Sequence, residues 1–237
     1  MLYMIGIGLH DPKDITFKGL EAINKASRVY LEYYTSKYAD IEGLRSFTGK
    51  DIILADRDMV ESGTVSILKD ADKSDIAFLV IGDPFAATTH IGLKLEAEEK
   101  GIPVKVIHNA SVLTAIGITG LELYKFGKVT SIPFGYEKVT APIEVCRKNQ
   151  QMGLHTLFLL DLDPINDRFM TINEACEYLK PLEPAVAIGC AGLGADNPEI
   201  ISGTLTELQS HNFFLFPQCL IIPGNLHFME EDAINRN

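Results

Sequence analysis

Two aspartates, Asp11 and Asp83, each follow an apolar run and a glycine turn. Asp83 comes after residues 76–81 in Gly82-Asp83-Pro84, and Asp11 comes shortly after Gly6-Ile7-Gly8. An apolar run of this length, rich in β-branched residues, is typical of a buried strand. A carboxylate at such a position accepts hydrogen bonds from hydroxyl groups and favours a cationic ligand. The alternative for Asp83 is an ordinary strand-to-helix turn, in which its side chain only caps the backbone.

The Gly6-Ile7-Gly8 turn begins like a dinucleotide-binding fingerprint. Asp11 stands where the third glycine belongs, and Pro12 changes the loop further. A carboxylate there repels a pyrophosphate, so the turn suits a ligand without phosphates better than NAD. Glu32, at the end of the next strand, could mimic the acid that binds the ribose of NAD, so a dinucleotide-binding oxidoreductase stays open as an alternative. S-adenosylmethionine, with a ribose, a cationic centre and no phosphate, suits both aspartates.

The rest of the sequence carries no familiar catalytic pattern. Ser111 does not lie in a G-x-S-x-G elbow, and the chain has neither a P-loop motif nor an H-E-x-x-H zinc motif. None of the four cysteines forms a C-x-x-C pair, which argues against a zinc site and favours buried thiols in a reducing compartment. We therefore expect no metal, and we assign no catalytic residue.

The composition predicts a soluble globular protein. Its net charge of −11 argues against a general surface for nucleic acid or for anionic membranes. No apolar run approaches the roughly 20 residues of a membrane span. The N-terminal residues 1–6 are typical of a strand rather than of a signal peptide. We expect a cytoplasmic protein that binds neither nucleic acid nor membranes directly.

Strand-like and helical segments alternate along the first half of the chain. This alternation is typical of βαβ units with a mostly parallel sheet, in which ligands bind outside the carboxyl ends of the strands. Asp11 and Asp83 both follow such ends, so we expect them to lie near each other. Strands are expected at residues 2–7, 29–33, 51–55, 76–81 and 104–107, and helices at 15–26 and 90–100.

The second half predicts a more mixed sheet. Strands are expected at residues 129–133, 155–160, 185–188, 199–205 and 218–222, and helices at 141–151 and 171–179. The predicted fold class is therefore α/β, with two α/β domains and an interdomain cleft. We place the N-terminal domain at residues 1–110 and the C-terminal domain at residues 111–237. A cleft between two such domains is a natural ligand site.

Taken together, these features resemble the tetrapyrrole methylase-like (class III) S-adenosylmethionine-dependent methyltransferases, and within them the diphthine synthase branch. The similarity covers nearly the whole chain. Gly82-Asp83-Pro84-Phe85 marks the wider family, whereas Glu32-Tyr33-Tyr34-Thr35 and Asn109-Ala110-Ser111 point to the diphthine branch. Further matching segments are Gly203-Thr204-Leu205 and Pro223-Gly224-Asn225-Leu226-His227.

The resemblance implies a tetrapyrrole methylase-like fold, a homodimer, and S-adenosylmethionine folded in the interdomain cleft. The implied acceptor is a histidine of translation elongation factor 2 that carries a 3-amino-3-carboxypropyl group. The amine of this group is methylated three times in the archaeal type, and eukaryotic relatives also methylate a carboxylate. By matching motifs, the donor contacts fall to Leu9, Asp83, Ala86, Ser111, Val112, Leu162, Gly203, Leu205 and His227.

Two departures from the family pattern lie toward the implied acceptor side. Residues 163–170 form a shorter stretch than in many relatives, and residues 189–194 lack an expected arginine. The implied reaction is an in-line displacement by a neutral amine, in which alignment matters most and Asp83 orients the donor rather than removing a proton. A methyltransferase of the same fold acting on a tetrapyrrole or corrin precursor stays open as the nearest alternative.

Overall fold

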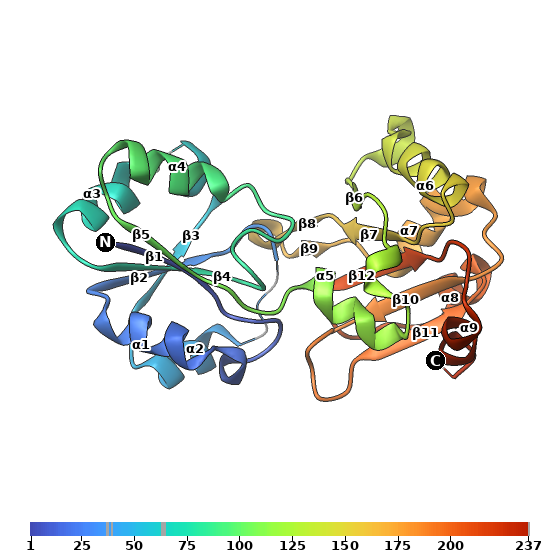
Figure 1. Ribbon diagram of the computed structural model, residues 1–237, viewed down its shortest axis with the longest axis horizontal. Coiled ribbons are helices and arrows are strands. Elements are labelled where there is room, and N and C mark those ends of the chain that lie inside the picture. Colours follow the sequence, from blue (N-terminus) through green and yellow to red (C-terminus); the bar gives the residue numbers. More distant parts are fainter. Residues whose placement is uncertain (37, 39, 63–64, 237) are drawn as a thin grey trace. The chain divides into compact units, whose positions relative to one another are not determined.

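The protein divides into two compact units, Met1–Leu113 (unit 1) and Thr114–Asn237 (unit 2), each of which is described by itself. The computed structural model describes residues 1–36, 38, 40–62 and 65–236, and Figure 1 labels their helices and strands. The boundary between residues 110 and 111, given above for two domains, stays a prediction.

Unit 1 is built on a five-stranded sheet in the order β3-β2-β4-β1-β5, in which every pairing is parallel. All residues of the central strands β1 and β4 are buried, which explains why their sequences are uninterrupted apolar runs. The carboxyl ends of the strands therefore share one edge of the sheet. The strands are β1 (Leu2–Gly6), β2 (Arg28–Glu32), β3 (Ile52–Ala55), β4 (Ile76–Val80) and β5 (Val104–Ile107).

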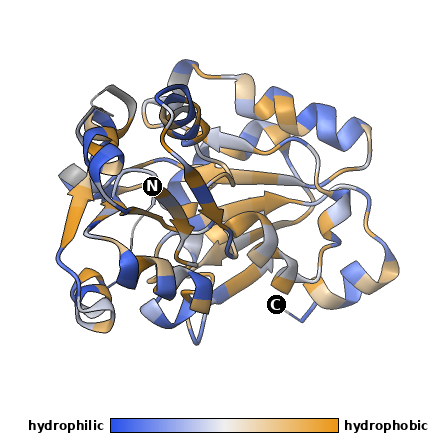
Figure 2. Ribbon diagram, turned by 60° about the vertical axis from the view of Figure 1, so that its left-hand side comes forward, coloured by the Kyte–Doolittle hydropathy of each residue, from blue (hydrophilic) through white to orange (hydrophobic). Residues whose placement is uncertain are grey.

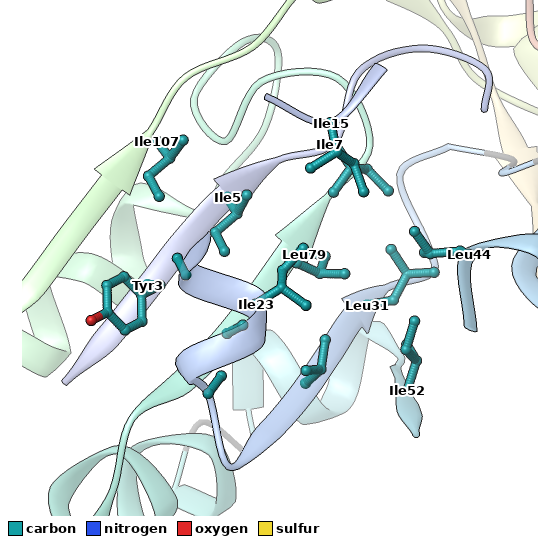
Figure 3. Close-up of a cluster of buried hydrophobic side chains, with 14 of the residues drawn as sticks. Tyr3, Ile5, Ile7, Ile15, Ile23, Leu31, Leu44, Ile52, Leu79 and Ile107 are labelled. Atoms are coloured by element: carbon teal, nitrogen blue, oxygen red, sulfur yellow. The ribbon is translucent and has the colours of Figure 1, made fainter. Parts of the chain in front are cut away.

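Helices cover both faces of this sheet because successive strand residues point to opposite faces. Ile5 and Leu79 face one cluster with Ile23 of α1, as Figure 3 shows. Met4 and Phe78 belong to the other cluster, which includes residues of α3 and α4. The helices are α1 (Phe17–Lys25), α2 (Ile41–Thr48), α3 (Val65–Lys73) and α4 (Ile91–Glu99), and α5 (Val112–Ala115) follows β5.

Unit 2 contains a mixed five-stranded sheet in the order β11-β10-β12-β7-β6. Only the β6–β7 pairing is parallel within this sheet of the described chain. The strands are β6 (Thr130–Ile132), β7 (Thr156–Leu160), β10 (Ala187–Ala191), β11 (Glu199–Gly203) and β12 (Gln218–Ile222). A small hairpin pairs β8 (Leu162–Asp163) with β9 (Arg168–Phe169). The helices are α6 (Ala141–Gln151), α7 (Ile172–Leu179), α8 (Leu205–Ser210) and α9 (Phe228–Ile234).

The predicted α/β fold class is confirmed. In Figure 2 the strands are coloured mostly as hydrophobic, while the helices carry both hydrophobic and hydrophilic residues. All four cysteines are buried and form no disulfide. They pack in the core like other small apolar residues. Among the described residues, no helix is both long enough and apolar enough to cross a membrane.

Candidate active site

Two glycine turns lie side by side at the carboxyl edge of the unit 1 sheet. The N–H of Gly82 donates to the carbonyl of Gly8 at 2.7 Å, and the N–H of Gly8 donates to the carbonyl of Gly82 at 3.4 Å. Both glycines have left-handed backbones, with φ of 82° at Gly8 and 79° at Gly82. A Cβ on Gly6 would lie 2.5 Å from the carbonyl oxygen of Gly82. The close approach of β1 and β4 past their ends therefore depends on glycine.

The Asp83 carboxylate ties the turn after β4 to the end of β5. Its Oδ1 accepts from the N–H of Phe85 at 3.0 Å, and its Oδ2 accepts from His108 Nδ1 at 2.8 Å and the N–H of Asn109 at 3.1 Å. Burial opposes ionisation of Asp83, but these hydrogen bonds outweigh burial and lower its pKa. Asp83 is thus an ionised acceptor with a fixed orientation, and a poor base for removing a proton.

The turn after β5 completes this edge. Asn109 Nδ2 donates to the carbonyls of Gly6 at 3.0 Å and Asp14 at 2.9 Å, which joins the ends of β5 and β1. Ser111 is buried, and its Cβ is 3.5 Å from where a Cβ on Gly82 would lie. The structure therefore brings five of the predicted donor contacts onto three neighbouring turns: Leu9, Asp83, Ala86, Ser111 and Val112.

Asp14 fills the turn that follows β1. Its Oδ2 accepts from the N–H groups of Leu9 at 3.1 Å, His10 at 2.9 Å and Asp11 at 3.4 Å. Asp11, to which we assigned the repulsion of phosphate, instead accepts from the N–H of Lys13 at 2.6 Å. The carboxylate on the turn is therefore that of Asp14. The spacing of Asp11 and Asp14 is that of a capping box, which was the signal in the sequence.

Glu32 does not offer its carboxylate to a ribose. It is fully buried, and it accepts from the N–H of Tyr34 and from the Thr35 hydroxyl, both at 2.8 Å. Burial raises its pKa, which its hydrogen bonds only partly offset. The Tyr34 hydroxyl lies 3.3 Å from Nε2 of the buried His90. The segment after β2 is thus a structural support for the turn after β4, and the acid that the oxidoreductase alternative needs is already engaged.

The predicted contacts in unit 2 lie at opposite ends of its sheet. β7 and β12 are antiparallel, with Leu159 opposite Cys219 and Thr156 opposite Ile222. Leu162 follows the carboxyl end of β7, whereas His227 follows the carboxyl end of β12. Gly203 pairs with Ala187 at the start of β10, which is the His227 end. A five-residue strand spans about 16 Å. The structure therefore groups Gly203, Leu205 and His227 but separates them from Leu162.

Gly203, Leu205 and His227 have local structural roles at their end of the sheet. Thr204 caps α8 in a reciprocal capping box with Glu207, and this cap lies between Gly203 and Leu205. Leu205 is buried in the core of unit 2. His227 is exposed and caps α9, where its Nδ1 accepts from the N–H of Met229 at 3.4 Å. The residue types of these two segments are thus the ones that two helix starts require.

The Leu162 end of the sheet carries a glycine turn at residues 192–194 that was not among the predicted donor contacts. Gly192 and Gly194 follow β10 with φ of 63° and 96°, and the N–H of Gly192 donates to the carbonyl of Pro217 at 3.0 Å. Leu193 between them is buried. Gln218, at the start of β12, accepts from the N–H of Ile172 at 2.8 Å. The glycine pair after an apolar strand was the one signal in the sequence.

The whole chain is similar to known methyltransferases. Residues 1–209 match the family model described as tetrapyrrole (corrin/porphyrin) methylases. The chain is 42% identical to the diphthine methyl ester synthase of Dictyostelium discoideum over 98% of this chain and 96% of that protein. The chain belongs to the diphthine synthases of the tetrapyrrole methylase family. It is 41% identical to the diphthine synthase of Methanococcus aeolicus over 99% of this chain and 96% of that protein.

The solved structures agree with this membership in the diphthine synthases. A crystal structure of diphthine synthase has a TM-score of 0.93 with 36% identity, over 99% of this chain and 94% of that chain. The protein is therefore an S-adenosylmethionine-dependent methyltransferase, as the resemblance implied. The relatives do not fit the oxidoreductase or the corrin-precursor alternatives. Within the described ranges, no group of three or more His, Cys, Asp and Glu side chains is arranged to hold a metal ion.

Proposed function

We propose that this methyltransferase trimethylates the amine of the 3-amino-3-carboxypropyl-modified histidine of translation elongation factor 2, which gives diphthine. The observation that carries the proposal is the similarity over almost the full chain to proteins named diphthine synthase and diphthine methyl ester synthase. The two names differ in whether a carboxylate is methylated as well. We choose trimethylation, the outcome implied above for the archaeal type.

The donor side of the proposal rests on the edge of the unit 1 sheet. A carboxylate offers about four acceptor positions. Asp83 uses three of them within the turn. One position therefore remains for a ribose hydroxyl, and the ionised group also favours the cationic sulfonium. Leu9, Ala86, Ser111 and Val112 supply backbone and small side chains beside it, which permit close approach to an adenosine.

In unit 2 we propose that the donor contacts come from the Leu162 end of the sheet. The support is geometric, since Leu162, the Gly192–Gly194 turn and Gln218 share that end. Gly203, Leu205 and His227, assigned by motif matching, would then serve the starts of α8 and α9 rather than the donor.

Two single substitutions distinguish the two ends of this sheet. Leu162→Lys puts a long charged side chain at the proposed donor contact of unit 2, and we expect the dissociation constant for S-adenosylmethionine to rise at least about tenfold, or ~1.4 kcal/mol. His227→Ala removes a helix cap, and we expect it to lower stability by about 1 kcal/mol while donor affinity changes less than about twofold. Titration calorimetry and thermal unfolding measure both. The reverse pattern of affinities would move the donor to the His227 end.

The proposed chemistry is a displacement at the methyl carbon. The nitrogen lone pair forms the new N–C bond while the C–S bond breaks and the sulfur keeps that electron pair. The amine must be neutral before each transfer, so protons leave between transfers and the trimethylated product is a fixed cation. Alignment of two bound reactants supplies much of the rate enhancement in such a reaction. We assign no general base among the residues of the chain.

The partners follow from the resemblance rather than from particular contacts. We propose that the protein acts in the cytoplasm as a homodimer, with elongation factor 2 as its protein substrate. Sedimentation analysis at micromolar concentration tests the dimer, for which we expect twice the mass of a single chain. A single-chain mass would contradict it.

The number of methyl groups on the acceptor tests the reaction type. After complete reaction with purified, precursor-bearing elongation factor 2, we expect the modified peptide to gain the mass of three methyl groups. Gain of a fourth group that is lost on mild alkaline hydrolysis would show that a carboxylate is methylated too, and would correct the proposal. No gain at all would contradict it.

A further inference from the structure

The turn after β1 holds three backbone N–H groups that converge on one oxygen of the protein itself. Leu9, His10 and Asp11 all donate to Asp14 Oδ2, at 3.1, 2.9 and 3.4 Å. Successive N–H groups that point into one concavity form an anion-binding nest. In dinucleotide-binding folds the turn after the first strand presents such groups to a pyrophosphate. Here a carboxylate of the chain takes the place of the phosphate.

The Asp14 carboxylate is fixed from several sides. Gly8 has no side chain, and a Cβ there would lie 2.2 Å from the Cβ of Asp14. Asn109 Nδ2 donates to the Asp14 carbonyl at 2.9 Å, which ties the backbone of Asp14 to the end of β5. Glycine is therefore required at position 8 for two reasons: its left-handed backbone conformation and the space that the Asp14 side chain occupies. A group held in this way does not swing aside when a ligand arrives.

An occupied nest changes which ligands the neighbouring edge accepts. The N–H groups can no longer donate to a phosphate, and a phosphate would meet the negative charge of Asp14 at short range. A sulfonium carries the opposite charge and needs no N–H donors. The same side chain therefore penalises an adenosine nucleotide and favours a cationic adenosine compound.

We propose that Asp14 is a specificity-determining residue, a built-in anion that makes this edge select a sulfonium-bearing adenosine over adenosine phosphates. It occupies the N–H groups of Leu9 and His10 and adds its charge beside them, and it takes no part in the methyl transfer, so it determines specificity rather than catalysis. The identity of the preferred ligand rests on the proposed function. The exclusion of phosphate rests on the geometry of the turn alone.

Asp11 provides a matched control in the same turn. It is also an aspartate and lies three residues before Asp14, but its carboxylate accepts from the N–H of Lys13 at 2.6 Å and takes part in the capping box of the short helix at residues 12–14, and its side chain is 39% exposed. Its charge is therefore close to that of Asp14 in sequence but is not placed in the nest. Both variants lose one negative charge from the same turn, so the difference between them reports on position.

The experiment compares 5′-methylthioadenosine, a neutral thioether, with ADP. Both contain adenosine, so the difference between their affinities measures the penalty on phosphate that the proposal assigns to Asp14. Dissociation constants for both are measured by calorimetry in the wild type and in Asp14→Ala, Asp14→Asn and Asp11→Asn. We expect the preference for methylthioadenosine over ADP to fall about tenfold or more in both Asp14 variants. In Asp11→Asn we expect it to change less than about threefold. Asp14→Asn keeps the shape of the side chain, so it tests the role of the Asp14 charge even if Asp14→Ala unfolds.

A preference that is unchanged in Asp14→Asn, or that falls equally in Asp11→Asn, would overturn the proposal. A wild type that binds neither methylthioadenosine nor S-adenosylmethionine would instead contradict the proposed donor site. In that case NMR of the backbone amides of Leu9 and His10 still tests whether the turn excludes phosphate. Addition of inorganic pyrophosphate should shift these amide signals in Asp14→Ala and leave them unchanged in the wild type. Identical behaviour of the two proteins would overturn the proposed exclusion of phosphate.

Discussion

Replacement of Asp83 by alanine is expected to weaken the binding of S-adenosylmethionine about a hundredfold, or ~2.7 kcal/mol. The carboxylate accepts hydrogen bonds from Phe85, His108 and Asn109, so its loss frees the turn after β4 from the end of β5. Hydrogen bonds to charged groups contribute about 1.5–3 kcal/mol each, and the proposed ribose contact is lost as well. Calorimetry measures the affinity, and circular dichroism checks that unit 1 stays folded.

Asp56→Ala is the control for this substitution. Asp56 also follows a strand of the same sheet and also accepts a backbone hydrogen bond, from the N–H of Met59 at 2.8 Å. We expect donor affinity in this variant to stay within about twofold of the wild type. Donor affinity that survives in Asp83→Ala, or that falls equally in Asp56→Ala, would remove Asp83 from the donor site.

Replacement of Glu230 by glutamine is expected to destabilise unit 2 by about 3 kcal/mol. The Glu230 carboxylate is fully buried and accepts from the N–H groups of Glu122 at 2.9 Å and His227 at 2.8 Å. It also pairs with Lys125 and accepts from His155 Nε2 at 2.9 Å. Burial opposes its ionisation, but these partners outweigh burial and lower the pKa of Glu230 from 4.5 to about 2.

The state of His155 in this network follows from its partners. The N–H of Gly224 donates to His155 Nδ1 at 2.9 Å, so that nitrogen carries the lone pair. The proton therefore sits on Nε2, which donates to Glu230. Burial lowers the pKa of His155, which agrees with a neutral ring. The charge of Glu230 is consequently balanced mainly by Lys125.

The contribution of Glu230 depends on pH in a defined direction. Its pKa is lower in the folded than in the unfolded protein, so its ionised form stabilises the fold above about pH 4.5. This contribution is lost as the pH falls from about 4.5 toward 2. Urea unfolding at pH 7 and pH 3 should show a large difference between the wild type and Glu230→Gln at pH 7 and a smaller one at pH 3.

Glu231→Gln is the control for the Glu230 prediction. Glu231 is the neighbouring residue of α9, but it is exposed. We expect its replacement to change the free energy of unfolding by less than about 0.5 kcal/mol at either pH. A Glu230→Gln variant as stable as the wild type at pH 7 would show that the buried network contributes nothing.

The elements that could be predicted are those whose burial gives a clear hydrophobic pattern in the sequence. β1 and β4 are buried on both faces, so they are continuous apolar runs with glycine turns after them. The predicted strand at residues 199–205 was too long, because Thr204 caps a helix that begins at Leu205. Helices α2, α3, α8 and α9 were not predicted. α2 and α3 are amphipathic, with polar residues between their apolar ones, and so lack the long apolar signal of the strands.

The site could be predicted only in part, for a different reason. The turns of unit 1 follow directly from the parallel strand order, which brings all carboxyl ends to one edge. In the antiparallel sheet of unit 2, the end at which a residue lies depends on strand pairing, which a motif does not record. The motif match assigns both Leu162 and His227 to the donor, and the register of β7 and β12 puts the two residues at opposite ends of the unit 2 sheet. The role of Asp14 depends on hydrogen bonds to three backbone groups, which residue type alone does not reveal.

Transfer of a labelled methyl group to elongation factor 2 tests the proposed reaction. The protein is incubated with methyl-labelled S-adenosylmethionine and the factor bearing the 3-amino-3-carboxypropyl histidine, and the label is located by mass spectrometry of the peptide. We expect the label on the amine of that histidine, with none on unmodified factor and little with the Asp83→Ala variant. Label on another residue or on the unmodified factor, or no transfer by a wild type that binds the donor, would contradict the account.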